Sequence, residues 1–378
     1  MPPLGPLSAL LVPRHLTRVL ILVTGAALLL VLVISPEGGP GWVPVRGPAR
    51  GASEGRHRGR LISELWAEGL PEQAWFAGDA RCAHLVTRFT RDRELPLVYL
   101  ASLPRSGNTW VRYLLEAATG LFTCVGGPEY HQYRNASSRN ASRTPEQIWQ
   151  VSRKGFNQWV DFGYLGELLN WTQGNTLVAR SQTWPQPWSV AEANRIDDTL
   201  QHPMAAFPAD RPRRAVLIIR DPFHEFISWK KYDHTHNMVN EGDMSDLYRG
   251  AAWHQFVVYY AHVWYELYSR WIRFTDDTHV LHYHRLTSEP MAELERLLPF
   301  LEVQPDPVRL ECVRAHLEGR VHSHRHGVVP DNETYPTLLR AEVWSHIHQL
   351  NQDLKARGRP PLPLQSYAFA EEFADIGL

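Results

Sequence analysis

Short apolar runs alternate with helix-spaced apolar residues along most of the chain. Four runs have the length and composition of buried strands, and they cover residues 97–102, 175–179, 214–219 and 278–283. Between and after them lie longer segments with apolar residues three and four positions apart, the spacing of one helix face. This alternation of strands and helices predicts an α/β domain.

One of the helical segments, residues 245–274, carries a stripe of large aromatic side chains. The stripe includes Trp253, Trp264 and Trp271. It could form the wall of an acceptor site or part of the core, and we favour the core because such stripes usually pack inside a domain.

The first strand, residues 97–102, leads through a tight turn into a helix. Backbone N–H groups at a helix start lack partners and carry partial positive charge. Gly107 lets the chain approach a ligand closely, and Arg105, Ser106 and Thr109 add side-chain donors. The segment predicts a cradle for a phosphate or sulfate. An ordinary strand-to-helix turn is the plainer alternative, and the Walker A pattern is absent from it.

A second candidate anion site follows the strand at residues 214–219. Arg220 stands at the end of that strand, and Ser228 follows eight residues later within a helix-like run. This spacing brings the two side chains close enough to hold one further phosphate. Two anion sites on neighbouring strands indicate one ligand with two phosphate or sulfate groups.

Both motifs resemble those of sulfotransferases that use 3′-phosphoadenosine 5′-phosphosulfate (PAPS). Residues 104–110 are similar to the family's 5′-phosphosulfate loop, Pro-[Lys/Arg]-Ser-Gly-[Thr/Asn]-Thr-Trp, and Arg220 with Ser228 is similar to its 3′-phosphate site. Residues 107–120 most resemble the sulfotransferase module of the WSC-domain-containing sialate sulfotransferases, although the WSC modules are absent. The resemblance implies a P-loop-like three-layer fold with a central parallel sheet flanked by helices.

The same resemblance implies an enzyme with PAPS as co-substrate, and it assigns the residues that bind PAPS. A basic loop near residue 320 covers the 3′ side of the nucleotide in the family. The implied PAPS-binding residues are Pro104, Arg105, Ser106, Gly107, Asn108, Thr109, Trp110, Arg220, Ser228, Arg320 and Arg325.

The catalytic residues match the family pattern less completely. At the position of Arg180, many sulfotransferases carry a lysine that contacts the transferred sulfuryl group, and a histidine base follows two residues later. Arg180 can keep the first role beside Arg105, but Gln182 cannot take a proton at neutral pH. For the base we favour Glu129 or His131. Lumenal glycan sulfotransferases, which the chain resembles, use a carboxylate from this part of the chain, and a histidine there would titrate near neutral pH. An ordinary surface loop is the alternative.

The first sixty residues differ in composition from the rest. An uncharged apolar run after Arg14 and Arg18 is interpreted as a transmembrane signal anchor, with a cleaved signal peptide as the alternative. A stretch rich in Gly, Pro and Arg follows, which is typical of a flexible stem. The expected parts are a cytoplasmic tail (1–18), a transmembrane anchor (19–35), a flexible stem (36–60), a lumenal sulfotransferase domain (61–360) and a C-terminal tail (361–378).

The glycosylation sequons and the cysteines are relevant to the cellular compartment in which the domain lies. Four sequons beyond the expected anchor agree with a lumenal domain, and they begin at Asn135, Asn140, Asn170 and Asn332. Resemblance to type II Golgi sulfotransferases then implies a single-pass Golgi membrane protein. The three cysteines permit at most one intrachain disulfide, and the sequence leaves the pairing open among Cys82, Cys124 and Cys312.

Charge and composition exclude some classes of function. The 39 Lys and Arg residues balance the 40 Asp and Glu residues, so no overall field points to nucleic acid. His322, His324 and His326 alternate without an acidic residue nearby, and His224-Glu225 lacks the second histidine of H-E-x-x-H. We therefore expect no metal.

Three functions stay open at this point. We favour a sulfotransferase that transfers the sulfuryl group of PAPS to a hydroxyl of a glycan or glycoconjugate, with a sialylated acceptor suggested by the subfamily resemblance alone. The second is a membrane-anchored protein that binds glycan or nucleotide without turnover, because Gln182 replaces the usual base. The third, a small-molecule kinase, is disfavoured by the missing Walker lysine. The sequence determines neither the acceptor nor the oligomeric state.

Overall fold

The computed structural model describes most of the region expected to form the folded domain. It describes residues 67–126, 163–168, 174–185, 204–205, 207, 209–235, 244–319 and 328–375. The chain divides into two compact units, residues 1–56 and residues 57–378, and every described residue belongs to the second unit.

The central sheet of the described region has five parallel strands in the order β4-β5-β3-β8-β9. These strands are β3 (Val98–Ala101), β4 (Cys124–Val125), β5 (Ala179–Ser181), β8 (Arg214–Ile219) and β9 (Asp277–His282). Neighbouring β3 and β8 run in register, with Ala101 beside Leu217. Since parallel strands end at the same edge, the residues that follow β3 and β8 in the chain meet there.

Two short strand pairs lie outside the central sheet. β1 (Gln73–Ala74) pairs antiparallel with β2 (Val86–Thr87), and β6 (Trp184–Pro185) pairs parallel with β7 (Met204–Ala205).

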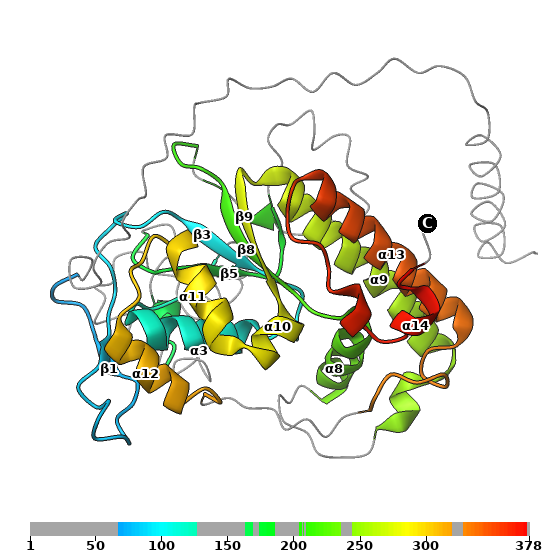
Figure 1. Ribbon diagram of the computed structural model, residues 1–378, viewed down its shortest axis with the longest axis horizontal. Helices are drawn as coiled ribbons and strands as arrows, with labels where there is room; N and C mark the ends of the chain where they lie inside the picture. The colour runs from blue at the N-terminus through cyan, green and yellow to red at the C-terminus, as the bar shows by residue number, and fades with distance from the viewer. Residues whose placement is uncertain are drawn as a thin grey trace, which may run out of the picture. The chain divides into compact units, whose positions relative to one another are not determined.

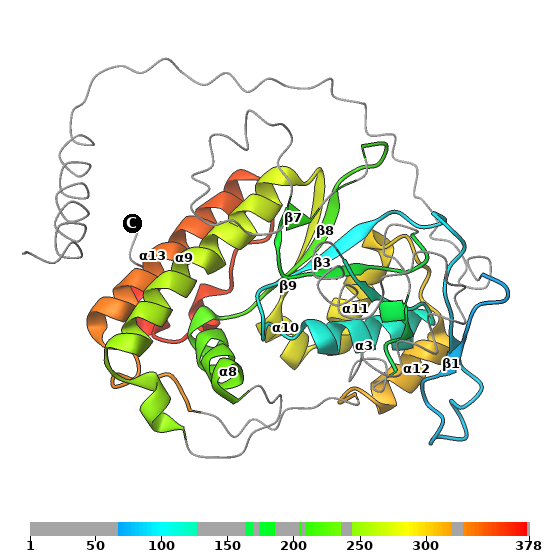
Figure 2. The ribbon, with the colours of Figure 1, turned by 180° about the vertical axis from the view of Figure 1, so that it is seen from behind.

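Separate groups of helices bury the two faces of the central sheet. Successive strand residues point to opposite faces, so Tyr99 and Ala101 belong to one core cluster, and Val98 and Leu100 belong to the other. The first face is covered by α8 (Pro222–Thr235), α9 (Gly250–Phe274) and α13 (Thr337–Ala356), and the second by α3 (Asn108–Thr119), α11 (Pro290–Phe300) and α12 (Pro307–Ala315). Figure 1 shows these layers, and Figure 2 shows them from behind. The predicted α/β architecture with a central parallel sheet is confirmed.

The long aromatic segment forms two helices rather than one. A short 3-10 helix, η3 (Ser245–Tyr248), precedes α9, and the extended backbone of Arg249 separates them. The aromatic stripe of α9 lies in the core, where the side chains of Trp253, Trp264 and Trp271 are each 1% exposed or less. The interpretation of the stripe as core is confirmed.

The third expected strand is displaced toward higher residue numbers. The apolar run at 175–179 predicted a strand that ended before Arg180, whereas β5 covers Ala179–Ser181 and places Arg180 beside Leu100 of β3. Arg180 is only 7% exposed at this position. The apolar pattern stopped too early because a charged residue, Arg180, takes a buried place in the middle of the strand.

The last described residues pack on the domain. They include the short helices η4 (Leu364–Ser366) and α14 (Ala370–Phe373). The side chains of Leu362 and Tyr367 are buried, and the indole N–H of Trp344 donates to the carbonyl of Ala368 at 3.1 Å. Residues 361–375, expected as a tail, therefore contribute to the core.

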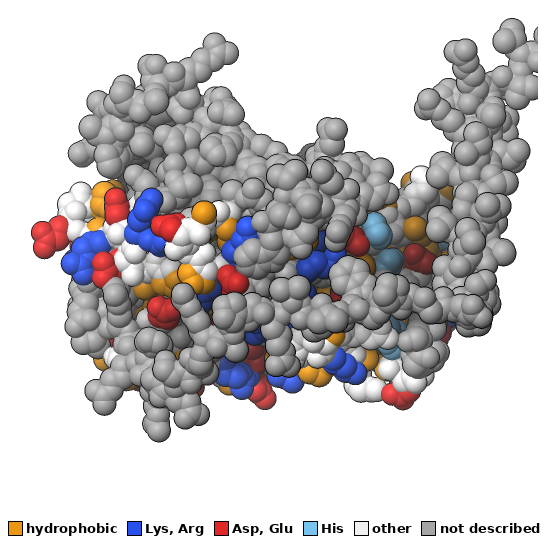
Figure 3. Space-filling view, turned by 90° about the horizontal axis from the view of Figure 1, so that it is seen from above, with side chains coloured by type: hydrophobic (Ala, Val, Ile, Leu, Met, Phe, Trp, Pro, Cys, Tyr) orange, Lys and Arg blue, Asp and Glu red, His pale blue; other side chains and the backbone are white. Residues whose placement is uncertain are grey.

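The expected membrane anchor at residues 19–35 lies outside the described residues. Within the described ranges, no helix combines the length and the apolar content that a bilayer crossing requires. On the face in Figure 3, acidic and basic side chains are interspersed over the coloured part of the surface, in line with the formal net charge of −1.

Candidate functional site

The turn between β3 and α3 has the backbone geometry of an anion cradle. Arg105 (φ 73) and Gly107 (φ 91) both take left-handed conformations, which turn the chain sharply before α3 begins at Asn108. A Cβ atom on Gly107 would lie 2.6 Å from Cε2 of Tyr283, so any other residue would displace that ring. Helix α3 has no side-chain cap, and its first N–H groups are therefore available to an anion.

The structure brings Arg105, Arg220 and Ser228 together at the edge where β3 and β8 end. Nε of Arg105 donates to Oγ of Ser228 at 3.1 Å, and Nη1 of Arg220 donates to the backbone carbonyl of Arg105 at 2.7 Å. Burial lowers the pKa of the Arg105 guanidinium, and the positive charge of Arg220 lowers it further. Because two cations this close repel each other, an anion bound between them is favoured.

Two tyrosine rings support these guanidinium groups. The guanidinium of Arg220 lies 4.7 Å from the ring centroid of Tyr283, and that of Arg105 lies 5.5 Å from the ring centroid of Tyr232. The sequence analysis missed both tyrosines. For Tyr283 a signal existed, because it is the first residue after β9 and so lies at the same sheet edge as Arg220.

Ser106 does not offer its hydroxyl to a ligand, contrary to expectation. Its side chain is fully buried, and its Oγ lies 2.6 Å from Oε1 of Glu225 and 2.8 Å from the carbonyl oxygen of Leu103. Asn108 is also buried, and its Nδ2 donates to Oγ of Ser102 at 3.1 Å. Both side chains hold the loop from behind, and the backbone N–H of Ser106 also points inward, donating to the carbonyl of Leu103 at 3.4 Å.

The other loop residues are partly exposed. Pro104, Thr109 and Trp110 are half-buried. The indole N–H of Trp110 donates to the carbonyl of Leu317 at 2.7 Å, and the carbonyl of Thr109 accepts the hydroxyl of Tyr164 at 2.9 Å. Trp110 thus ties the start of α3 to the segment that leads toward residue 320.

Arg180 and Gln182 form a pair next to the loop. Nη1 of Arg180 donates to Oε1 of Gln182 at 2.9 Å, and Arg180 lies beside Leu100 of β3. Gln182 therefore orients the Arg180 guanidinium, a role that the sequence analysis did not anticipate.

Several expected site residues lie outside the described residues. They are the candidate bases Glu129 and His131, the loop arginines Arg320 and Arg325, and the sequon residues Asn135, Asn140 and Asn170. The fourth sequon residue, Asn332, is exposed, and its side-chain oxygen accepts a hydrogen bond from Arg340.

A buried polar network fixes α3 from its far side. Nη1 of Arg112 forms an ion pair with Oε1 of Glu167 at 2.7 Å, and Nε of Arg112 donates to Oγ1 of Thr123 at 2.8 Å. Oε1 of Glu116 accepts from the backbone N–H of Thr123 at 2.8 Å. Burial raises the pKa of Glu116 to about 8.

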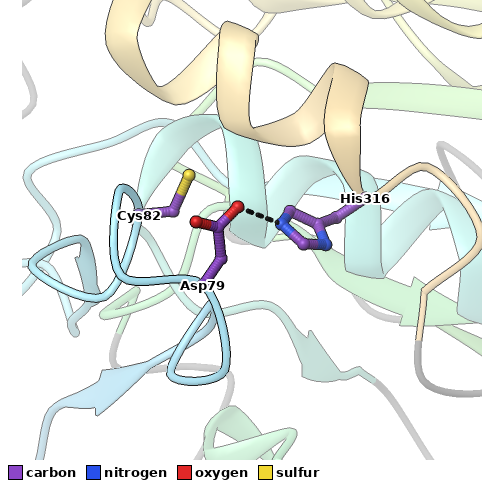
Figure 4. Close-up of side chains that lie close together, drawn as sticks. All are labelled: Asp79, Cys82 and His316. Carbon is purple, nitrogen blue, oxygen red and sulfur yellow. Dashed lines mark hydrogen bonds and ion pairs between the residues drawn. The ribbon is translucent and has the colours of Figure 1, made fainter.

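Among the described residues, one group brings potential metal ligands together, and Figure 4 shows its members, Asp79, Cys82 and His316. The sulfur of Cys82 is bonded to that of Cys312, so it is not a thiolate ligand. Nε2 of His316 lies 3.1 Å from Oδ2 of Asp79. The disulfide and the contact between His316 and Asp79 therefore join the segment that carries Asp79 and Cys82 to the C-terminal end of α12. Cys82 pairs with Cys312, and Cys124 is a free, buried thiol.

The fold and the site define a class of protein. It is an α/β protein in which Arg105 of the β3–α3 turn and Arg220 after β8 adjoin at the carboxyl edge of a parallel sheet, with Ser228 hydrogen-bonded to Arg105. Such an arrangement suits a ligand with two anionic groups.

The chain belongs to the sulfotransferase family, whose family model matches residues 96–307, more than half of the chain. The match includes the strands β3, β8 and β9 and the loop that carries Arg105.

Curated relatives that the chain matches include WSCD family members, which confirms the expected resemblance. WSCD family member GA21586 of Drosophila pseudoobscura pseudoobscura is 26% identical over 250 residues, 65% of this chain and 63% of that protein. WSCD family member AAEL009094 of Aedes aegypti is 25% identical over 226 residues, 59% of this chain and 56% of that protein. The chain thus spans less than two thirds of the length of these two relatives.

Similar solved structures include two sulfotransferases. The mouse sulfotransferase SULT7A1, complexed with PAP, gives a TM-score of 0.41 at 10% identity and covers 71% of this chain and 88% of its own. A sulfotransferase from Alicyclobacillus acidocaldarius gives a TM-score of 0.35 at 12% identity and covers 70% of this chain and 96% of its own.

Proposed function

We propose that the described domain is the catalytic domain of a sulfotransferase, which transfers the sulfuryl group of PAPS to a hydroxyl of a glycan or glycoconjugate. The observation that carries the proposal is the junction of Arg105, Arg220 and Ser228 at the edge where β3 and β8 end. PAPS carries a phosphosulfate at one end and a 3′-phosphate nearby, which matches two adjoining cationic subsites. The family of the chain supports the same co-substrate.

The residues of the site divide the work of sulfuryl transfer. Negative charge grows on the leaving phosphate, and Arg105 with the first backbone N–H groups of α3 stabilises it. Arg220 and Ser228 hold the 3′-phosphate, which fixes the nucleotide so that an acceptor oxygen can approach in line. Arg180 brings a further cation from β5.

The proton of the acceptor hydroxyl needs a base, and Glu129 or His131 stays our proposal for it. Gln182 cannot serve, because its amide does not titrate near neutral pH and its oxygen accepts from Arg180.

Separate observations support the proposed compartment and the proposed acceptor. The exposed sequon residue Asn332 and the disulfide between Cys82 and Cys312 favour an oxidising, glycosylating compartment. With the anchor expected at residues 19–35, this supports a type II Golgi membrane protein with a lumenal domain. A sialylated acceptor is supported by the relationship to WSCD family members alone.

One observation favours a second candidate function. The residue that replaces the usual histidine base, Gln182, is committed to Arg180, so a protein that binds the nucleotide without turnover is the alternative. Purified full-length protein incubated with PAPS and a glycan panel, with the mass shift of each glycan as readout, separates the two. Transfer supports the enzyme, and binding of 3′,5′-bisphosphoadenosine without transfer to any acceptor supports the alternative.

A variant pair tests the subsite itself. Arg220→Ala removes a charge-assisted contact to the 3′-phosphate and should weaken binding of 3′,5′-bisphosphoadenosine roughly 10- to 100-fold. Arg249→Ala is the matched control, since Arg249 forms an exposed ion pair with Glu333 and should leave the affinity unchanged. Equal affinities for the two variants would contradict the assignment, and competition by ATP rather than by the bisphosphonucleotide would favour a kinase.

A further inference from the structure

A fully buried carboxyl group lies directly behind the loop that we propose binds the phosphosulfate. Glu225 of α8 is fully buried, and its Oε1 lies 2.6 Å from Oγ of Ser106. The same Oγ lies 2.8 Å from the carbonyl oxygen of Leu103, at the start of the loop. The hydroxyl of Tyr268 accepts from the backbone N–H of Leu103 at 3.2 Å and lies 3.4 Å from Oγ of Ser106. These contacts clamp the loop from its inner side.

The surroundings of Glu225 favour its neutral form. Burial raises the pKa of Glu225 to about 8, against the opposing effects of Ser106 and Arg220. The charged and titratable groups that face it are Arg220 and Asp221 at the start of its own helix, Tyr268 from α9 and Tyr367 from the C-terminal segment. A carboxyl that is protonated at neutral pH therefore lies behind a loop suited to anions.

The protonation state decides which hydrogen bonds the loop can make. When Glu225 is neutral, its O–H can donate to Oγ of Ser106, and the Ser106 O–H is then free to donate to the Leu103 carbonyl. When Glu225 is ionised, Ser106 must donate to the carboxylate, because a hydroxyl has one proton. The Leu103 carbonyl then keeps only the backbone N–H of Ser106, at 3.4 Å.

Ionised Glu225 would also oppose the ligand by its charge. Its carboxylate would lie behind the loop in a buried site, where charges interact more strongly than in water. An anion bound on the outer side of the loop would be repelled by this carboxylate, because only the loop would separate the two negative charges. Both effects disfavour nucleotide binding while Glu225 is charged.

We propose that Glu225 is a positioning residue that holds the anion-binding loop ready for the nucleotide only while its carboxyl is protonated, so that nucleotide binding is linked to one proton. The inference rests on the proposed function, because it assigns the loop to the phosphosulfate of PAPS. This role differs from that of the catalytic base, since Glu225 is fully buried behind the loop and takes no part in the transfer itself.

The test measures binding of 3′,5′-bisphosphoadenosine to the full-length protein by calorimetry across the titration of Glu225. Below about pH 8 the wild-type affinity should be level, and above it the affinity should fall by up to about tenfold per pH unit. Glu225→Gln keeps a neutral side chain that can donate to Ser106. This variant should therefore bind with the low-pH affinity of the wild type throughout.

The chain offers a matched control in Glu116→Gln. Glu116 is a second fully buried carboxyl whose pKa burial raises to about 8, but it contacts Thr123 rather than the loop. Its variant should keep the wild-type fall in affinity above about pH 8. A merely structural effect of removing a buried acid would instead change the two variants alike.

A second measurement needs no variant. In wild-type protein at about pH 8.5, binding should take up a proton, so the observed heat should change with the ionisation enthalpy of the buffer. Heats that are independent of the buffer, or an equal fall in affinity in Glu225→Gln, would overturn the inference while leaving the proposed function intact. Absence of binding by the wild type at every pH would overturn both.

Discussion

Adding one methyl group at Gly107 should weaken nucleotide binding as well as destabilise the fold. Gly107 has φ 91, and a Cβ atom there would lie 2.6 Å from Cε2 and 2.9 Å from Cδ2 of Tyr283. The ring of Tyr283 lies against the guanidinium of Arg220, 4.7 Å from it. Gly107→Ala therefore moves Tyr283 and, through it, the arginine assigned to the 3′-phosphate.

The magnitude follows from two contributions. A left-handed backbone costs a non-glycine residue about 1 to 2 kcal/mol. The Tyr283 ring must also retreat by roughly 1 Å to restore an ordinary carbon–carbon contact, and it then loses part of a cation–π contact worth about 0.5 to 2 kcal/mol. We expect Gly107→Ala to lower the free energy of unfolding by about 2 to 3 kcal/mol and to weaken nucleotide binding roughly tenfold or more.

Gly358 provides the control, since it has φ 63 and a Cβ atom added there would have no heavy atom within 4 Å. Gly358→Ala thus carries the backbone cost alone, about 1 kcal/mol, and should leave the affinity unchanged. Urea unfolding gives the stability of each variant, and calorimetry with 3′,5′-bisphosphoadenosine gives the affinity. If the two alanine variants bind the nucleotide equally well, the link from Gly107 through Tyr283 to Arg220 is refuted.

Three further predictions concern buried groups. Glu116 and Glu225, both with a pKa of about 8, hold more protons in the folded than in the unfolded state near neutral pH, so the free energy of unfolding should fall by about 2 kcal/mol from about pH 7 to about pH 8. Glu116→Gln should halve this fall in urea titrations. The disulfide between Cys82 and Cys312 spans 230 residues, and reduction should lower the thermal midpoint and cost about 3 to 5 kcal/mol. Cys124 is buried with its pKa raised to about 12, and mass spectrometry should find it alkylated only after unfolding.

The sequence predicted the backbone of the site better than its side-chain contacts. The change from strand to helix spacing located the turn before α3. Arg220 and Ser228, which the sequence placed near each other, both contact Arg105 of that turn. The outward or inward direction of Ser106 could not be predicted this way. It depends on Glu225, a residue 119 positions away whose burial is set by packing between layers.

The burial of charged residues explains the other differences between the predicted and the observed structure. Arg180 was placed beyond the end of its strand, and Glu225 was weighed only as a fragment of a zinc motif, since charged residues are seldom buried and therefore read as surface or loop residues. In the structure Arg180 is held by Gln182, two residues further along the chain, and Glu225 is held by Ser106 from another segment. A tertiary pair such as Glu225 with Ser106 leaves no periodic signal in a single sequence.

Asp221, the residue after Arg220, fixes the start of the helix that carries Ser228. Its Oδ1 accepts from the backbone N–H of Phe223 at 2.9 Å, and Pro222 begins α8, a combination that fixes the start of a helix. Its Oδ2 accepts from the backbone N–H of Ala368 at 2.9 Å, which ties the C-terminal segment to the same point. Because α8 carries Ser228, one carboxylate sets the position of Ser228 relative to Arg220. The anion subsite is thus built on a helix start that the end of the chain holds in place.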